Sequence, residues 1–342
     1  MTKFKKSFIE LKEAEAKILL SELGGEPYRF NQIHNWIFKN QISDWGEVEN
    51  IPKKLQDNLS KTINLHPLEI VHIKGSKTEP TRKFLFKTQD GNSIESVLMH
   101  DKERTTICIS SQVGCAVDCK FCATASMGFI KNLTAGEIID QVLHIERESK
   151  KKTTNVVFMG MGEPFLNYRQ VMEGATRLNK EMGIGARRIT ISTAGIVPKI
   201  RQMADENCQF KLAISLNAVD EDKRKNIMPL TDTHSLKSLI DSAFYYYEKT
   251  RRFITFEFVL LKGINDSPSD GKQLIKYLAG LPCKVNVIPY NEIGGKFDRP
   301  EEQKIHNFLN ILKDAPFTVT VRWSKGVDID AGCGQLAVKE YK

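Results

Sequence analysis

The sequence has no apolar run that approaches the roughly 20 residues needed to span a bilayer. Its opening segment, Met1–Lys12, alternates charged with single apolar residues and lacks the apolar stretch of a secretory signal. Repeats and low-complexity tracts are absent as well. These absences argue against a membrane, secreted or fibrous protein. We therefore expect a cytoplasmic chain with no membrane-bound part, in which thiols stay reduced.

Of the 342 residues, 41% are hydrophobic and 27% are charged, which is ordinary for a globular protein. This length is enough for one large α/β domain and a smaller appended domain. The formal net charge is +8 at pH 7. A basic excess of this size favours an acidic partner, most often nucleic acid, although a solvated lysine-rich surface would give the same charge.

Residues 1–65 are predicted to form a helical domain. Apolar residues recur at helical spacing on both sides of a break at Gly24–Pro27, and Pro52 suits the first turn of a third helix. The apolar positions are Ile9, Leu11, Ala16, Ile18, Leu19, Phe30, Ile33, Trp36 and Ile37. Basic residues are interleaved with the aromatics at Arg29, His34, Lys39 and Lys53. The pattern fits either the core of a small bundle or an RNA-binding accessory domain, and we favour the second.

Residues 66–103 are predicted to form a short β extension. Apolar residues alternate in Leu68–His72 and Lys83–Lys87, and Asp90–Gly91 is a hairpin signal before a strand at Ser93–Leu98. From residue 104 to 342, strands alternate with helices. The predicted strands are Thr105–Ser111, Asn155–Gly162, Arg188–Gly195, Phe210–Ala218, Thr255–Gly263 and Cys283–Tyr290, with a further candidate at Thr318–Arg322. The predicted helices are Thr134–Arg147, Tyr168–Met182, Pro198–Ala204, Ser235–Lys249, Ser267–Ala279 and Glu301–Lys313. This alternation predicts an α/β fold with a parallel sheet and right-handed crossovers, in which active loops follow the carboxyl ends of strands.

The most informative motif is a run of three cysteines, Cys115, Cys119 and Cys122, separated by three residues and then by two. A ferredoxin-type run would carry a fourth cysteine nearby, and a zinc site usually closes with a second cysteine or histidine pair. Three thiolates alone would hold a cubane iron–sulfur cluster at three corners and leave one iron open for chemistry. A structural zinc loop or buried reduced thiols are the alternatives.

This loop, with Phe121 before its last cysteine, resembles the signature of the radical S-adenosylmethionine (SAM) enzymes. The resemblance implies a partial (β/α)6 barrel, a [4Fe–4S] cluster held by the three cysteines, and SAM bound at the open iron. It also implies cofactor contacts at the strand ends, namely Gly162, Glu163, Ser192, Ser215, Leu216, Asn217 and Asn291. Family members often carry histidine at the position of Asn217, so a side-chain contact there stays open.

Two further cysteines narrow the resemblance. Cys108 precedes the cysteine loop, and Cys333 lies between two glycines near the C-terminus, which suggests mobility and room around the sulfur. Both stretches, and nearly the whole chain, resemble the RNA adenine methyltransferases of the RlmN type. This implies methylation of adenine C2 in 23S rRNA and in tRNA, at the adenosine just 3′ of the anticodon. Cys208 and Cys283 match no motif and are interpreted as buried hydrophobic residues.

The resemblance also implies a mechanism that uses two SAM molecules per turnover. One methylates Cys333, and the other yields a 5′-deoxyadenosyl radical that takes hydrogen from that methyl group. The carbon radical adds to adenine C2, Glu95 removes the C2 proton, and Cys108 attacks Cys333 to form a disulfide and release the product. The implied partners are the two RNAs and an electron donor such as flavodoxin or ferredoxin, with the chain acting as a monomer.

Two other functions stay open. The first is methylation of the same rRNA adenine at C8 by a related resistance enzyme. Against it stands Pro164 in the segment Gly162–Asn167, where the C8 enzymes tend to have alanine. The second is a non-catalytic RNA-binding protein with structural zinc, which gives no account of Cys108 and Cys333.

Overall fold

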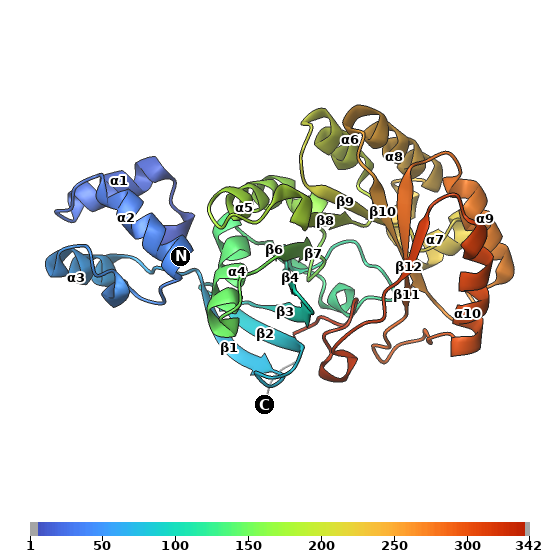
Figure 1. Cartoon of the computed structure of the whole chain (residues 1–342), viewed down its shortest axis with the longest axis horizontal. Coiled ribbons are helices and arrows are strands. Elements are labelled where there is room, and N and C mark those ends of the chain that lie inside the picture. Colours follow the sequence, from blue (N-terminus) through green and yellow to red (C-terminus); the bar gives the residue numbers. More distant parts are fainter. Residues whose placement is uncertain (1–5, 339–342) are drawn as a thin grey trace.

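The computed structural model describes residues 6–338. Its N-terminal part is a small bundle of α1 (Glu13–Glu22), α2 (Arg29–Asn35) and α3 (Lys53–Thr62), with α2 continuing as a wider turn at Trp36–Asn40. The bundle lies at one side of the molecule, beside α4 and β1 (Figure 1). These helices confirm the predicted helical character of the N-terminal region.

Most of the predicted apolar positions pack into the core: Ile9, Ala16, Ile33 and Ile37 are buried, and Leu11, Leu19, Phe30 and Trp36 are partly buried against it. Leu20, Leu55 and Leu59, which were not predicted, are buried as well. Ile18 is a correction, because α1 turns this side chain away from the bundle and leaves it 61% exposed. Pro52 also stands one position earlier than predicted. It is the residue just before α3 rather than part of its first turn. Proline has no backbone N–H to donate, so it costs the helix no hydrogen bond at this position.

Within the described residues, ten strands form one sheet in the order β1-β2-β3-β4-β7-β8-β9-β10-β11-β12. The first four, β1 (Leu68–Lys74), β2 (Thr81–Thr88), β3 (Ser93–Asp101) and β4 (Arg104–Cys108), pair antiparallel. A bulge after Ile70 breaks the alternation predicted to continue to His72, which is exposed. The β extension therefore continues directly into the main sheet.

From β4 onward the strands pair parallel, as predicted. They are β7 (Asn155–Phe158), β8 (Ile189–Thr193), β9 (Lys211–Ser215), β10 (Ile254–Leu260), β11 (Cys283–Pro289) and β12 (Thr318–Val321). The sheet curves, and the helices cover its outer face (Figure 1). The result is an open barrel of the predicted α/β class, with β12 as its last strand.

The helices that cross between these strands match the predicted ranges closely. They are α4 (Ala135–Ser149), α5 (Tyr168–Lys180), α6 (Val197–Asp205), α8 (Leu236–Thr250), α9 (Pro268–Leu278) and α10 (Glu302–Ile311). The expected capping box at the start of α4 is present, since the Glu137 amide donates to Thr134 Oγ1 at 3.1 Å and the Thr134 amide to Glu137 Oε2 at 2.8 Å. The short α7 (Glu221–Ile227) was not predicted, because its mostly charged sequence carries no apolar period.

A buried polar cluster joins the N-terminal bundle to the sheet. His66 Nδ1 lies 2.5 Å from Asp140 Oδ1 on α4, and His66 Nε2 lies 2.8 Å from the carbonyl oxygen of Ile42. The Leu68 amide donates to Asp140 Oδ2 at 3.0 Å, and His144 lies 3.3 Å from the same oxygen. The bundle is thus fixed to α4 by charged groups as well as by apolar packing. Among residues 6–338, no helix is both long enough and apolar enough to traverse a lipid bilayer.

Candidate active site

The cysteine loop follows β4 at the carboxyl edge of the sheet, as the fold predicts. A small hairpin of β5 (Gln112–Gly114) and β6 (Phe129–Asn132) closes the base of the loop. Gly114 has φ +69°, and a Cβ at this position would lie 1.7 Å from the carbonyl oxygen of Gly128. Only glycine can therefore close the base of this loop without displacing its backbone.

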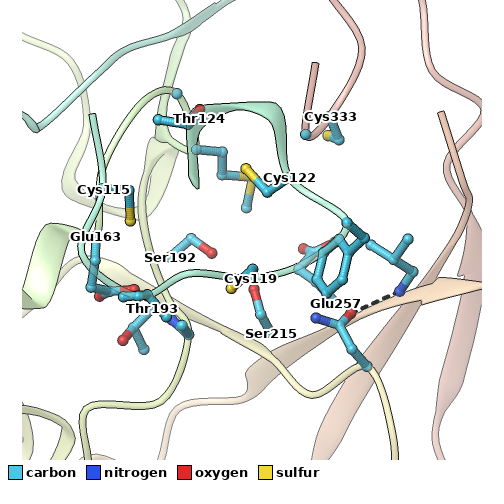
Figure 2. A pocket seen from close by; sticks show the side chains of 18 of the residues that line it. Cys115, Cys119, Cys122, Thr124, Glu163, Ser192, Thr193, Ser215, Glu257 and Cys333 are labelled. Atoms are coloured by element: carbon cyan, nitrogen blue, oxygen red, sulfur yellow. Dashed lines mark hydrogen bonds between the residues drawn. The ribbon is translucent and has the colours of Figure 1, made fainter. Parts of the chain in front are cut away.

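All three cysteines of the loop line one cavity (Figure 2). Burial raises the pKa of Cys115 to about 12 and raises the pKa values of Cys119 and Cys122 as well. Three neutral thiols of this kind become ligands only when a metal displaces their protons. The loop also holds the sulfurs by its backbone, since the Cys115 amide donates to Gly128 O at 2.9 Å and the Cys122 amide to Cys119 O at 3.0 Å.

The end of β7 forms a second wall of this cavity. Gly162 has φ +95°, and a Cβ there would lie 2.4 Å from Gln112 Cβ, so only glycine fits this position. Its backbone therefore lines the cavity without a side chain. Glu163 is buried, and its carboxylate accepts from the amides of Phe165 at 2.9 Å and Ala194 at 2.7 Å. Burial raises the pKa of Glu163 to about 7 despite these donors. Each carboxylate oxygen keeps a lone pair for a cationic ligand group.

The predicted strand-end residues divide into two sets. Ser192, Ser215 and Asn217 line the cavity, whereas the Leu216 side chain packs in the apolar core. Asn217 has φ +59°, and its Oδ1 accepts from the Val259 amide at 2.9 Å, so its side chain already braces β10. The Leu216 side chain thus points into the core, and the predicted cofactor contact at this position stays a prediction that falls to its backbone.

Asn291 is not among the described residues that line the cavity. Its Nδ2 donates to Ser324 Oγ at 2.8 Å and to the carbonyl oxygen of Cys333 at 3.0 Å. Its Oδ1 is buried and has no partner within the described residues. The structure thus gives Asn291 a clear role in holding the Cys333 loop, and its predicted cofactor contact stays a prediction.

Cys333 lies where two cavities meet. It lines the cavity of the cysteine loop, and it lines a second cavity together with Cys108 at the end of β4. Both are free thiols, and burial raises the pKa of Cys108 to about 12. Gly332 is packed closely, since a Cβ there would lie 2.7 Å from Gln335 Oε1 and 2.9 Å from Asn291 Nδ2. The glycine before Cys333 therefore permits close packing, and the mobility expected from the sequence stays a prediction.

The Cys333 loop is bonded directly to the cysteine loop. The Ala123 amide donates to the carbonyl oxygen of Gly334 at 2.7 Å, and Thr124 Oγ1 donates to the carbonyl oxygen of Leu336 at 2.6 Å. Thr124 and Leu336, which the second bond joins, are more than 200 residues apart in the sequence. The fold thus brings Cys333 to the three-cysteine loop through hydrogen bonds that local sequence patterns do not predict.

Glu95 is not among the described residues that line either cavity. It lies on β3, fully buried, with its Oε1 2.9 Å from Lys83 Nζ on β2. Its Oε2 accepts from the Ala337 amide at 3.1 Å. Glu95 is therefore close to the C-terminal segment but occupied by an ion pair and an amide.

The residues that line the cysteine-loop cavity without having been singled out in the sequence analysis include Thr124, Met159, Glu257 and Arg322. Arg322 stood in a predicted strand, and Glu257 could have been found as a lone carboxylate in an otherwise apolar strand. Its Oε1 accepts from Asn286 Nδ2 at 2.9 Å, while Oε2 is buried with no partner within the described residues.

The donor set fits a thiolate-bound cluster and a small zwitterionic cofactor. The three cysteines line the cavity together with Glu163, Ser192 and Ser215 (Figure 2), and the backbone at Gly162 lines it as well. Three thiolates leave one corner of an iron–sulfur cubane without a protein ligand. The amine and carboxylate of an amino acid are suited to that corner.

Comparisons with known proteins agree with this chemistry. Residues 109–271 match the model of the radical SAM superfamily, and residues 7–65 match that of the ribosomal RNA large subunit methyltransferase N-terminal domain. The chain is 42% identical over 339 residues to a probable dual-specificity RNA methyltransferase RlmN of Thermotoga petrophila, covering 98% of this chain and 99% of that protein. It is 43% identical over 334 residues to the protein of that name from Clostridium perfringens, covering 97% and 96%.

A solved structure shares the whole architecture. The crystal structure of a radical SAM methyltransferase from Sphaerobacter thermophilus aligns with a TM-score of 0.93 and 42% identity, covering 98% of this chain and all of that one. The N-terminal bundle, the sheet and the C-terminal segment are therefore parts of one shared design.

Proposed function

The chain belongs to the RlmN family of RNA methyltransferases in the radical SAM superfamily, and from this premise we propose that it methylates adenine at C2. The proposed substrates are an adenosine of 23S rRNA and the adenosine just 3′ of the anticodon in tRNA. The name shared by the relatives, dual-specificity RNA methyltransferase, supports two RNA classes. The basic charge of +8 is compatible with both.

The observation that carries the proposal is the position of Cys333, between the cavity of the three loop cysteines and the cavity of Cys108. Adenine C2 carries a C–H that is too weakly acidic for ordinary nucleophilic methyl transfer. A radical route avoids this difficulty. It needs a sulfur that carries a methyl group and that lies between a source of radicals and a second thiol. When bound, the cluster and SAM supply methyl groups and a 5′-deoxyadenosyl radical.

In this proposal Cys115, Cys119 and Cys122 hold the cluster, and Gly162, Glu163, Ser192, Ser215, Asn217 and the backbone at Leu216 bind SAM, with Asn291 still a candidate contact. Cys333 carries the methyl carbon and joins it to the base, so that protein and RNA are transiently linked. Glu95 takes the C2 proton. For this, its carboxylate has to exchange the Ala337 amide for the base, which requires movement of the C-terminal segment. Cys108 then attacks Cys333 and releases the RNA.

We further propose the surrounding requirements of this reaction. Two SAM molecules are used per turnover, an electron donor such as flavodoxin or ferredoxin reduces the cluster, and the chain acts as a cytoplasmic monomer. Residues 1–65 act as the RNA-binding domain, 66–103 as the β extension and 104–342 as the catalytic barrel.

The deciding experiment is mass spectrometry of nucleosides from 23S rRNA and tRNA treated with the reconstituted enzyme, SAM and reductant. We expect 2-methyladenosine, whereas 8-methyladenosine would favour the C8 reaction. Pro164, which begins the turn Pro164–Asn167 beside the cavity, favours C2. A zinc-loaded protein without sulfide would remove both reactions.

Three variants separate the proposed roles. Cys333→Ala should keep the cluster and give no methylated RNA. Cys108→Ala should accumulate protein linked to RNA, and a normal yield of free methylated RNA would reject its role. Glu95→Gln should slow breakdown of the linked species, and unchanged turnover would remove Glu95 from the mechanism.

A further inference from the structure

Arg322 occupies a position between the two cavities. It follows β12, where its amide donates to the carbonyl oxygen of Val287 at 2.9 Å. Its side chain lines both the cavity of the cluster cysteines and the cavity of Cys108, and Cys333 is the cysteine that shares both with it. Its Nη1 lies 3.4 Å from the sulfur of Met159. The guanidinium is therefore held within the barrel beside the two cysteines of the proposed mechanism.

The charge of Arg322 acts on both sulfurs. The pKa of Arg322 is raised, and the main cause is the charge of Cys333. Glu257 and Cys108 also raise this pKa, whereas burial lowers it. In the other direction, burial and then Cys333 raise the pKa of Cys108 while Arg322 lowers it, and the net value is about 12. A thiol with a pKa near 12 is almost entirely protonated at pH 7, and only the thiolate is a useful nucleophile.

The other charged groups that line the cavity of Cys108 have partners of their own, and Lys325 lies in that lining together with Asp101. Asp101 of β3 lies 3.4 Å from Lys325, and the Nε of Arg104 donates to Asn155 at 3.4 Å. Glu95, on the same face of β3, is bridged to Lys83. In the described part of the chain, Arg322 is thus the cation left to act on Cys108.

We propose that Arg322 is a positioning residue that favours the thiolate form of Cys108 and directs it at the sulfur of Cys333. The inference rests on the proposed function, in which Cys108 resolves the protein–RNA adduct. A guanidinium suits this task because it stays charged and presents several N–H groups in one plane, so it can face two sulfurs at once.

The step that Arg322 assists is balanced within the adduct. The Cys108 thiolate attacks Cys333 Sγ, an S–S bond forms, and the bond from Sγ to the methylene carbon breaks. The electron pair of that bond goes to the carbon, which takes a proton from water and becomes the methyl group of the product. The two cysteines are oxidised by two electrons and the carbon is reduced by two. An added dithiol restores the cysteines for the next turnover.

The first test measures the reactivity of Cys108 without any RNA. Cluster-loaded enzyme is treated with iodoacetamide from pH 6 to 10, and alkylation of Cys108 is localised by tandem mass spectrometry. An opposite charge close to an acidic group lowers its pKa by about 1–3 units. Arg322→Gln should therefore slow alkylation of Cys108 at least about tenfold below pH 9, and Arg322→Lys should restore most of the rate.

Two controls accompany this test. Arg104→Gln removes an equal charge from the same cavity and should leave the Cys108 profile unchanged. Cys208, which lies outside both cavities' described linings, reports general accessibility within each sample. Iron and sulfide content confirm that each variant retains its cluster. An identical Cys108 profile in wild type and Arg322→Gln would overturn the inference, even in an enzyme that methylates RNA normally.

The second test asks at which step Arg322 acts. Arg322→Gln should still methylate Cys333 but accumulate protein linked to RNA, as expected for Cys108→Ala, and raising the pH should release that RNA. Loss of Cys333 methylation in Arg322→Gln would assign the residue to an earlier step and reject the proposed one. If Cys108→Ala forms no adduct at all, the proposed function fails, while the alkylation profile still decides the role of Arg322.

Discussion

The ion pair of Lys83 and Glu95 offers the sharpest prediction about the folded chain. The two side chains are 3% and 0% exposed, and Nζ lies 2.9 Å from Oε1. Lys83 Nζ also lies 3.4 Å from the carbonyl oxygen of Asp330, while the Ala337 amide donates to Glu95. The pair therefore anchors the segment that carries Cys333 against β2 and β3.

Lys83→Met removes the cation and keeps most of the side-chain volume. Breaking one partner of a buried pair costs about 3–5 kcal/mol, because the remaining charge stays out of water. The 342 residues, at about 2.1 cal/mol/K each, give an unfolding entropy of about 0.7 kcal/mol/K. The melting temperature should thus fall by about 4–7 °C.

The control is the double variant Lys83→Met/Glu95→Leu, which replaces both charges by apolar groups. Its free energy of unfolding should return to within about 1 kcal/mol of wild type. Lys237→Met, which breaks the exposed pair with Asp241, should change stability by less than about 1 kcal/mol. Denaturant titration of cluster-loaded protein measures all three variants. A loss below 1 kcal/mol in Lys83→Met, or no recovery in the double variant, would refute the reasoning.

Two further predictions concern the bundle junction and the cysteine loop. Burial lowers the pKa of His66, but Asp140 and the Ile42 carbonyl oxygen together raise it by more, so the folded pKa lies above the ordinary value near 6.5. The stabilisation from His66 is full below pH 6.5 and is lost as the pH rises through the folded pKa. Wild type should therefore lose stability relative to His66→Gln between pH 6.5 and 9. Melting temperatures of the two proteins measure this difference. Gly114→Ala should prevent correct closure at Gly128 and lower the iron bound on reconstitution several-fold, whereas Gly280→Ala, also at positive φ but with open space around it, should bind iron normally.

Local patterns were enough to predict most of the secondary structure, for identifiable reasons. Parallel strands buried on both faces read as apolar runs, and the crossing helices carry caps such as Thr134. The failures lie where tertiary packing decides. Ile18 fits a helical period yet faces solvent, and the bulge after Ile70 changes the face that His72 takes. The short α7 is held by its cap at Asp220 rather than by an apolar face.

The candidate site divides in the same way. Cys115, Cys119 and Cys122 are local in sequence, so their shared cavity could be predicted from spacing. The sequence marks Glu257 only as a lone carboxylate in an apolar strand, and the place of Glu257 and Arg322 in the cavity could not be predicted, because the direction of their side chains depends on strand register. In the register of the sheet, Glu257 of β10 lies opposite Asn286 of β11, and Asn286 lies opposite Thr320 of β12. Arg322 follows Thr320 by two residues, so the two side chains take the same face of the sheet. A single-residue slip of β12 would turn the guanidinium away from the barrel interior.

In the proposed reaction the sulfur of Cys333 has to serve several partners in turn, and the anchoring of its backbone bears on how it can do so. Hydrogen bonds hold the backbone on both sides of it, at the Cys333 carbonyl through Asn291 and at the Gly334 carbonyl through Ala123. Gly334 itself has φ +82°, which turns the chain sharply just after the sulfur. A fixed backbone leaves rotation about χ1 as the main freedom of the thiol. Such a rotation can carry the sulfur between the cavity of the cluster and the cavity of Cys108 without unfolding the segment. Asn291→Ala should therefore loosen the loop and slow adduct resolution as well as adduct formation, which quench-flow analysis of the two phases would measure. A defect confined to SAM binding would instead return Asn291 to the role of a cofactor ligand.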